Sequence, residues 1–232
     1  MEKIINLGTS YGNAYALPCG DKYCLIDTGY PFDYKHFLRK TKKCGVDLNK
    51  IKYIVVTHVH ADHVGFLQPL LEKTQATLVC ATEDKDRFLS GWNVEETFIS
   101  RFDLWLISKL SVLFRRFTQK FPPVTYQNVV DADEQPLVQY GITLQKLSGH
   151  TQNDLCAYYK DMIFCGDICM NGTGATNYAP MWIENNEKLV ESWEKLLQSN
   201  ANTLCPTHGK PFPLQDLLKC VEKQRNKTLK KL

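Results

Sequence analysis

The sequence predicts an α/β protein in which two sheets pack face to face and helices cover their outer sides. Short β-rich segments separated by glycine turns open the chain, and strand and helix patterns then alternate through both halves. Because each half supplies strands and apolar helix faces, two stacked sheets with helices outside would bury all of these faces. The 232 residues, 44% of them hydrophobic, suit one sizeable core, and we expect a single domain over residues 1–232.

The first half begins as a predicted meander and then alternates between strand and helix. The helical pattern that starts at residue 32 stops at Gly45, a natural residue for the turn after a helix. The predicted elements are strands at 3–7, 14–18 and 22–26, a helix at 32–44, a buried strand at 51–56, a helix at 64–73 and a strand at 76–81.

The second half repeats this order of events. The predicted elements are strands at 136–140, 143–147, 155–159 and 162–165, a helix at 187–198 and a strand at 203–204. We expect the Lys/Arg-rich tail after Lys219 to fray.

Residues 83–130 do not fit the alternation and are interpreted as a helical insertion. From Phe98 to Phe117 the apolar residues recur at steps of three or four, which is typical of an amphipathic helix. Three roles are open for this stripe: a lid over the site, a cover for a sheet edge, or a contact in a homodimer. As a lid it would favour a substrate with an apolar chain.

Charge and composition limit the classes of partner. The formal net charge of +3, from 28 Lys+Arg against 25 Asp+Glu, is too small to mark the chain as a binder of nucleic acid or membranes. The N-terminus lacks the pattern of a secretory signal, and no run of about eighteen apolar residues predicts a membrane span. The nine cysteines are odd in number and mostly lie in apolar runs, so we expect free thiols and a cytoplasmic location.

The decisive motif is a cluster of imidazoles and a carboxylate directly after the buried strand at 51–56. His58, His60, Asp62 and His63 fall within six residues, a density that is hard to explain structurally. Imidazole and carboxylate are the ligands that zinc and similar metals prefer, and a loop between strand and helix lets several side chains converge. The motif therefore predicts a metal site.

Three further ligands are expected at the ends of later strands. His150, Asp167 and His208 each have a glycine beside them, which permits unusual backbone angles and a close approach to a site. Of the six histidines only His36 lies outside these motifs, and it is interpreted as a helix-surface residue.

In order and spacing these motifs, with Asp27 before Thr28 and Gly29, resemble those of the metallo-β-lactamase superfamily over residues 3–213. The resemblance implies an αββα sandwich of two mixed sheets with its metal site at one edge. It also implies a ligand assignment: one ion on His58, His60 and His150, a second on Asp62, His63 and His208, and Asp167 bridging both. Asp27 would orient the ligands from behind, the alternative being an ordinary turn residue.

The resemblance implies a dinuclear hydrolase, with two zinc ions as the expected cofactors and manganese or iron as alternatives. Ions about 3.5–4 Å apart would lower the pKa of a shared water towards ~7, and the resulting hydroxide would attack the substrate. Asp62 is the expected catalytic residue, orienting the nucleophile or moving a proton. Tyr178 could donate a hydrogen bond to the substrate or could simply pack.

The substrate is expected to be a small ester, lactone, thioester or phosphodiester. The best-known true β-lactamases have a cysteine where this chain has Asp167, so antibiotic hydrolysis is not expected. A glyoxalase-II-type thioesterase is disfavoured because no helical glutathione-binding domain is evident after His208, and a tRNA-processing ribonuclease because no long basic arm is evident. Two alternatives stay open: a sulfur dioxygenase with one iron, and a metal-binding member of the fold without turnover.

Overall fold

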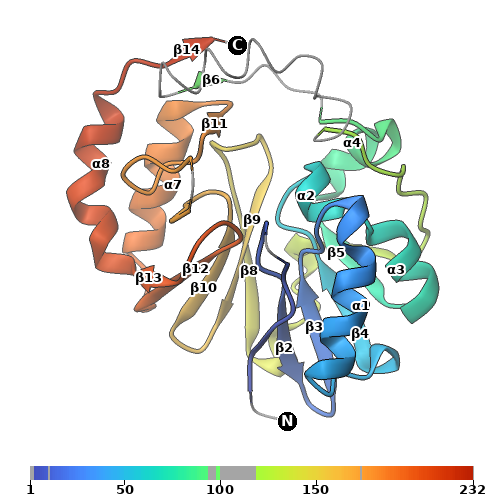
Figure 1. Ribbon diagram of the computed structural model, residues 1–232. Helices are drawn as coiled ribbons and strands as arrows, with labels where there is room; N and C mark the ends of the chain where they lie inside the picture. The colour runs from blue at the N-terminus through green and yellow to red at the C-terminus, as the bar shows by residue number, and fades with distance from the viewer. Residues whose placement is uncertain (1–2, 10, 94–97, 100–118, 173, 232) are drawn as a thin grey trace.

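Two sheets stand against each other and carry helices on their outer faces, as the computed structural model of the chain shows (Figure 1). The structure describes residues 3–9, 11–93, 98–99, 119–172 and 174–231. This architecture confirms the expected αββα sandwich of mixed sheets.

The first sheet is parallel at its centre and antiparallel at its N-terminal edge. β3 pairs in parallel with β4, β4 with β5 and β5 with β7, whereas β1, β2 and β3 form the expected meander. In sheet order its strands are β1 (Ile5–Asn6), β2 (Tyr15–Cys19), β3 (Lys22–Ile26), β4 (Ile51–Val55), β5 (Thr77–Cys80) and β7 (Val129–Asp131).

The second sheet is antiparallel except where β10 pairs in parallel with β12. In sheet order its strands are β13 (Phe212–Pro213), β12 (Thr203–Pro206), β10 (Met162–Gly166), β9 (Asp154–Tyr159) and β8 (Ile142–Leu147). Short strands β11 (Trp182–Ile183), β6 (Phe98–Ile99) and β14 (Lys230–Lys231) form a small separate sheet.

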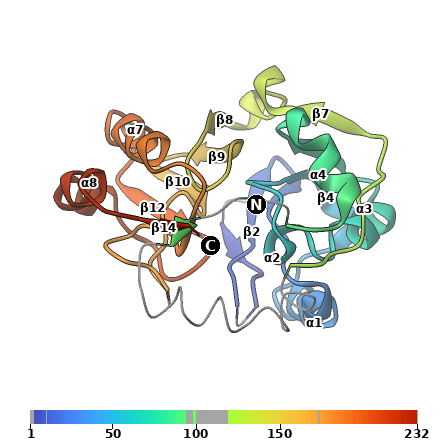
Figure 2. The same cartoon turned by 90° about the horizontal axis from the view of Figure 1, so that it is seen from above.

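The helices flank the two sheets on opposite sides of the molecule (Figures 1 and 2). Beside the first sheet lie α1 (Tyr34–Lys43), α2 (Ala61–Val64), α3 (Leu67–Thr74) and α4 (Lys85–Ser90), and beside the second lie α7 (Asn186–Leu197) and α8 (Leu218–Arg225). Short 3-10 helices are η1 (Pro31–Asp33), η2 (Leu48–Lys50), η3 (Thr82–Asp84), η5 (Ala132–Glu134), η6 (Val138–Tyr140) and η7 (Leu214–Leu217).

Apolar side chains fill the three spaces between these layers. Leu17, Val55 and Phe164 are fully buried in the cluster that both sheets share, whereas Phe37 packs under the helices of the first sheet and Trp193 under those of the second. Burial of each such side chain stabilises the fold by about 1.5–3 kcal/mol. The loops that carry the candidate metal ligands therefore extend from well-packed sheets and helices.

The predicted strand at 136–140 is wrong, since Val138–Tyr140 forms η6. Gln135 adopts a left-handed conformation, and its side-chain amide bonds the backbone N–H and carbonyl of Leu144 in β8 at 2.9 and 2.7 Å. This side chain thus occupies the position beside β8 that a strand partner would need.

Two helix predictions also need correction. The helix expected at 64–73 begins earlier, as α2, and is interrupted before α3, so Asp62 and His63 lie on a short helix and not in a loop. The tail after Lys219 does not simply fray, because α8 runs to Arg225 and buries Val221 against the second sheet's helices.

The insertion is described only in part. Phe98 belongs to strand β6, so the apolar stripe does not begin as a helix, and residues 129–130 belong to β7 of the first sheet. Residues 100–118 lie outside the described part, so the lid, edge-cover and homodimer roles stay predictions.

All nine cysteines are free, and all of them except Cys44 are buried. In the described part of the chain, no helix is both long and apolar enough to cross a membrane.

Candidate metal centre

The first four candidate ligands follow strand β4 without a gap. Val55 ends the strand, an extended turn carries His58 and His60, and α2 then begins with His60 as its N-cap. Thr28 fastens this helix, because its N–H and hydroxyl both donate to the carbonyl of His63, at 2.9 and 2.6 Å. These bonds hold the last residue of the HxHxDH motif against the segment that follows β3.

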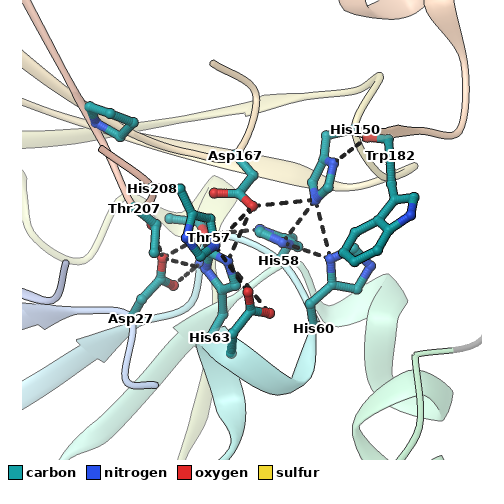
Figure 3. Close-up of polar contacts among 12 residues, drawn as sticks. Asp27, Thr57, His58, His60, His63, His150, Asp167, Trp182, Thr207 and His208 are labelled. Atoms are coloured by element: carbon teal, nitrogen blue, oxygen red, sulfur yellow. Dashed lines mark hydrogen bonds and ion pairs between the residues drawn. The ribbon is translucent and has the colours of Figure 1, made fainter. Parts of the chain in front are cut away.

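The other three candidate ligands come from the ends of strands in the second sheet. His150 follows β8, Asp167 follows β10 and His208 follows β12. The structure brings all three to the α2 turn, so both sheets contribute to a single centre (Figure 3).

Three imidazoles converge in the first of two groups (Figure 3). His58 Nε2 lies 3.0 Å from His60 Nδ1, and His150 Nε2 lies 3.1 Å from the first nitrogen and 3.2 Å from the second. Zn–N bonds of about 2.0–2.1 Å in a tetrahedron place neighbouring ligand atoms roughly 3.3–3.4 Å apart. The three nitrogens therefore have nearly the spacing of one face of a zinc tetrahedron.

The second group contains two carboxylates and two imidazoles. His208 Nε2 lies 3.0 Å from Asp62 Oδ2 and 3.4 Å from Asp167 Oδ2, while His63 Nε2 lies 3.6 Å from the same Asp167 oxygen. Asp167 Oδ2 is also 3.9 Å from His150 Nε2 in the first group. It is thus the atom that lies between the two groups.

Two buried polar atoms point to a missing partner within the second group. Among the described residues, His63 Nε2 and Asp167 Oδ1 are buried without any hydrogen-bond partner. Such groups are costly in a folded protein unless something satisfies them. A cation would satisfy both, so the donor set fits a metal ion.

Hydrogen bonds on the side away from the centre determine which imidazole nitrogen can bind a metal. His150 Nδ1 donates to the carbonyl of Trp182 and His208 Nδ1 to the carbonyl of Tyr11, each at 2.8 Å, because a carbonyl can only accept. His63 Nδ1 likewise donates to Asp27 Oδ2 at 2.9 Å. In all three residues Nε2 is left to face the centre, as a metal requires.

The comparisons with known proteins agree with this geometry. A family model described as the Metallo-beta-lactamase superfamily matches residues 7–208, most of the chain. The chain belongs to the metallo-beta-lactamase superfamily. Its predicted membership is therefore confirmed.

Relatives of this chain within the superfamily carry varied names. It is 27% identical over 207 residues to "Beta-lactamase-like protein 2 homolog" of Caenorhabditis elegans, covering 85% of this chain but only 55% of that protein. It is 36% identical over 61 residues to "UPF0173 metal-dependent hydrolase SAR1785" of Staphylococcus aureus, covering 25% of this chain and 27% of that protein. The chain thus spans about half the length of the worm relative.

A solved structure of the metallo-beta-lactamase SMB-1, in complex with mercaptoacetic acid, shares the fold. Its TM-score is 0.70 at 15% identity, with 96% of this chain and 91% of that chain covered. At this identity the likeness concerns the fold alone.

Asp27 connects the loops that carry the candidate ligands. Its carboxylate accepts from the N–H and hydroxyl of Thr57, both at 2.8 Å, from the Thr207 hydroxyl at 3.1 Å and from His63. Asp27 has a φ of +58°, a left-handed conformation that costs a non-glycine residue about 1–2 kcal/mol. Its contacts with both ligand loops offset this strain, so it is more than a turn residue.

In the first group, the surroundings lower the pKa values of His58 and His60 and so favour neutral imidazoles. Burial and the neighbouring histidines hold the pKa of His58 well below its usual range. Burial also lowers the pKa of His60 to about 4, although the charge of Asp62 opposes this shift. Both side chains are therefore neutral at pH 7, the form that binds metal.

The second group behaves in the opposite way. Burial disfavours the charged form of His208, but Asp167 and Asp62 outweigh it and raise its pKa to about 9. Asp27, Asp167 and Asp62 likewise overcome burial and hold the pKa of His63 well above its ordinary value. The same carboxylates that could hold a cation therefore raise the pKa of both imidazoles.

Sequence reasoning missed the groups that hold the ligands from behind. Thr57 directly precedes His58, and its hydroxyl lies 3.1 Å from His58 Nδ1. Asp154 accepts from the backbone N–H groups of His150 and Thr151, at 3.0 and 3.1 Å, which fixes the loop after β8. An Asp four residues after a candidate ligand is a weak signal, because Asp side chains also bond nearby backbone N–H groups in ordinary loops.

Two residues are not brought into the centre. Tyr178 does not point at a substrate position, since its hydroxyl donates to Asp216 at 3.2 Å and its ring stacks on Phe212 at 4.2 Å. His36 is exposed on α1, as expected.

Proposed function

We propose that this chain is a dinuclear metal-dependent hydrolase that acts on a small ester, lactone, thioester or phosphodiester. One observation carries the proposal: two adjoining groups of ligand atoms, His58/His60/His150 and Asp62/His63/Asp167/His208, connected by one carboxylate oxygen of Asp167. Two separate groups favour two ions over the single iron of a sulfur dioxygenase.

When bound, a pair of zinc-type ions supplies an activated water at neutral pH and polarises the substrate's carbonyl or phosphoryl oxygen. Zinc fits the His/Asp donors best, and manganese or iron would suit the same set. His58, His60 and His150 would hold one ion, Asp62, His63 and His208 the other, and Asp167 both.

Asp62 is the proposed catalytic residue. Its side chain is 15% exposed, whereas those of His63 and Asp167 are 0% and 7% exposed, so it lies on the open side of the centre. Asp62 Oδ2 lies 3.0 Å from His208 Nε2, and interactions with His63 and His208 overcome burial to hold its pKa below its ordinary value. As a carboxylate it can accept a proton from a water or orient that water towards the substrate.

Turnover and metal content together test the proposal. Metal-replete protein should hydrolyse a generic ester or phosphodiester, and His60→Ala should lower kcat/KM by more than about 100-fold, beyond the about 10–100-fold typical of lost hydrogen bonds behind a ligand. Elemental analysis of protein purified without added metal should find two ions per chain. Equal rates for both proteins would overturn the hydrolase, and one iron with sulfur-oxidising activity would favour the dioxygenase.

A further inference from the structure

Three aromatic side chains form a continuous cluster, called here the aromatic cluster: Tyr11 between β1 and β2, and Tyr30 and Phe32 at the start of η1. The rings of Tyr30 and Phe32 stack, with centroids 5.0 Å apart and planes 14° apart. Tyr11 stands edge-on to both, at 5.9 Å and 88° from Tyr30 and at 5.5 Å and 80° from Phe32.

This aromatic cluster is open to solvent. Tyr11 and Phe32 are each 60% exposed. A single exposed apolar side chain needs no explanation, but exposed rings in mutual contact form a continuous apolar surface that the described residues leave open. Their perpendicular arrangement makes a corner, with the Phe32 ring as one wall and the Tyr11 ring as the other.

Backbone contacts tie both loops to the second ligand group. The Tyr11 carbonyl accepts from Nδ1 of the ligand His208. Thr28, two residues before Tyr30, bonds the His63 carbonyl. A Cβ on Gly65, which follows α2, would lie 2.4 Å from Pro31 Cδ and 2.5 Å from the Gly29 carbonyl oxygen, so the loop that carries Tyr30 and Phe32 lies directly on the end of this helix.

The aromatic cluster also lies on the side from which the centre can be reached. Asp62 and His208 are 15% and 17% exposed, whereas His150 is only 2% exposed. The Tyr11 carbonyl, which accepts from His208 Nδ1 at 2.8 Å, fixes the cluster beside this open side. Burial and the charges of Asp62 and Asp167 raise the pKa of the Tyr30 hydroxyl. A substrate entering at Asp62 and His208 would therefore pass the three rings.

We propose that Tyr11, Tyr30 and Phe32 form a recognition subsite that stacks against a planar aromatic group of the substrate, next to the Asp62/His208 side of the metal centre. This inference rests on the proposed hydrolase and narrows its substrates to those with an aromatic ring close to the bond that is cleaved. A flat ring on Phe32, with its edge towards Tyr11, would repeat the two geometries already present in the aromatic cluster.

Matched esters test the subsite without changing the leaving-group chemistry. Benzyl acetate and cyclohexylmethyl acetate both release a primary alcohol of similar size, but only the first carries a planar ring. Metal-replete protein should prefer the benzyl ester by about three- to tenfold in kcat/KM, the range expected for an aromatic pair. The preference should fall towards one in Phe32→Leu and in Tyr11→Leu, which keep an apolar side chain and the backbone carbonyl.

Val138→Ala is the matched control, because Val138 is an exposed apolar residue that lies before β8, whereas His150 follows the other end of that strand. It should keep the wild-type preference. Thermal unfolding of each variant checks that its fold is intact.

A binding measurement separates this inference from the proposed function. Calorimetry should show that benzylphosphonate binds the metal-replete protein more tightly than cyclohexylmethylphosphonate by the same factor, and that Phe32→Leu removes the difference. Preferential binding without hydrolysis of either ester would support the subsite while the hydrolase fails. Turnover of both esters with no preference, or a preference that survives both substitutions, would overturn the subsite. A Phe32→Leu effect confined to self-association in sedimentation would overturn it as well, since the surface would then be a contact between copies.

Discussion

At the scale of single residues, the hydrogen-bond acceptors of the candidate ligands determine how these side chains are oriented. His63, His150 and His208 each use Nδ1 to donate to a fixed acceptor, so their Nε2 atoms face one another before any metal binds. Preorganisation of this kind reduces the side-chain entropy that is lost on metal binding. Asp27 is the central acceptor, because it connects the β4 turn with the loop that carries His208.

Exchanging carboxylates for amides should separate the roles of Asp167 and Asp27. Asp167→Asn removes a charge shared by both ligand groups, and we expect it to lower kcat/KM by more than about 100-fold. Asp27→Asn only replaces an acceptor of His63 and the two threonines, which typically costs about 10–100-fold. Asp216→Asn, at the Tyr178 hydroxyl, is the control. Equal losses in the first two variants at full metal occupancy would contradict the bridging role of Asp167.

Metal loading should release protons from one ligand group only. His208, with a pKa of about 9, and His63, whose pKa is also raised, are protonated at pH 7, whereas His58 and His60 are neutral. A histidine ligand must lose its extra proton to bind a metal, so the Asp62/His63/His208 position should expel about two protons per ion at pH 7. Its affinity should therefore rise with pH through the pKa of His208 at about 9, whereas protonation of His58 and His60 should make little difference to the other position above pH 5.

Calorimetric titrations in buffers of different ionisation enthalpy measure these protons directly. If the two ions release the same number, the electrostatic difference between the two groups is wrong.

The candidate ligands that the structure brings together were predictable from the sequence, but the groups that hold them in place were not. Three histidines and an aspartate within residues 58–63 are enough to predict a metal site. The other candidates, His150, Asp167 and His208, each lie beside a glycine at a strand end. Tyr11 and Trp182 act through their backbone carbonyls, and any residue type can supply a carbonyl. No side-chain pattern reveals such a contact.

At the scale of elements, tight packing between a loop and a helix fixes the position of a candidate ligand. Gly149 has a φ of +139°, and a Cβ there would lie 2.4 Å from the Leu189 Cα in α7. Its carbonyl also accepts from the N–H groups of Glu184 and Asn185 at the start of that helix, both at 3.0 Å. The loop that carries His150 is therefore packed directly against α7.

Gly149→Ala should destabilise the fold by about 2–5 kcal/mol, because it combines the strain of overpacking with an unfavourable φ. Gly20→Ala is a matched control: Gly20 also has a positive φ, +63°, but its Cβ would meet nothing within 4 Å, so we expect a loss of about 1 kcal/mol. Urea unfolding of the two metal-free variants measures both. Similar losses would show that backbone conformation, and not the contact with Leu189, determines the role of Gly149.

Most elements follow from local pattern, and the exceptions have tertiary causes. The strand at 22–26 and the helix near 187–198 were expected almost to the residue, since hydrophobic periodicity and flanking turns define them. Residues 136–140 have a strand-like composition, yet the Gln135 amide takes the place beside β8. Strand β7 is too short to stand out from sequence and depends on pairing with β5.

At the scale of the whole molecule, the centre lies where the two halves of the sandwich meet. His58, His60, Asp62 and His63 follow the first sheet, whereas His150, Asp167 and His208 follow the second. Sequence periodicity predicts two sheets and outer helices, but it does not tell which strand ends meet; the family resemblance supplied that step. The side chains from the two sheets meet only in the packed structure (Figure 3).

Metal removal should therefore loosen the junction between the two sheets. Ions held from both halves stabilise the folded state by mass action, by about 4 kcal/mol when free metal is 1,000 times its Kd. For a chain of this size, each kcal/mol corresponds to about 2–4 °C in Tm, so chelation should lower Tm by about 8–16 °C. His150→Ala should reproduce much of this loss in metal-replete protein, because it removes a ligand that the second half supplies. Asp216→Asn should retain the full response to chelation. An unchanged Tm in protein shown by elemental analysis to have lost its metal would mean that the two halves are held together by the shared core around Leu17, Val55 and Phe164 alone.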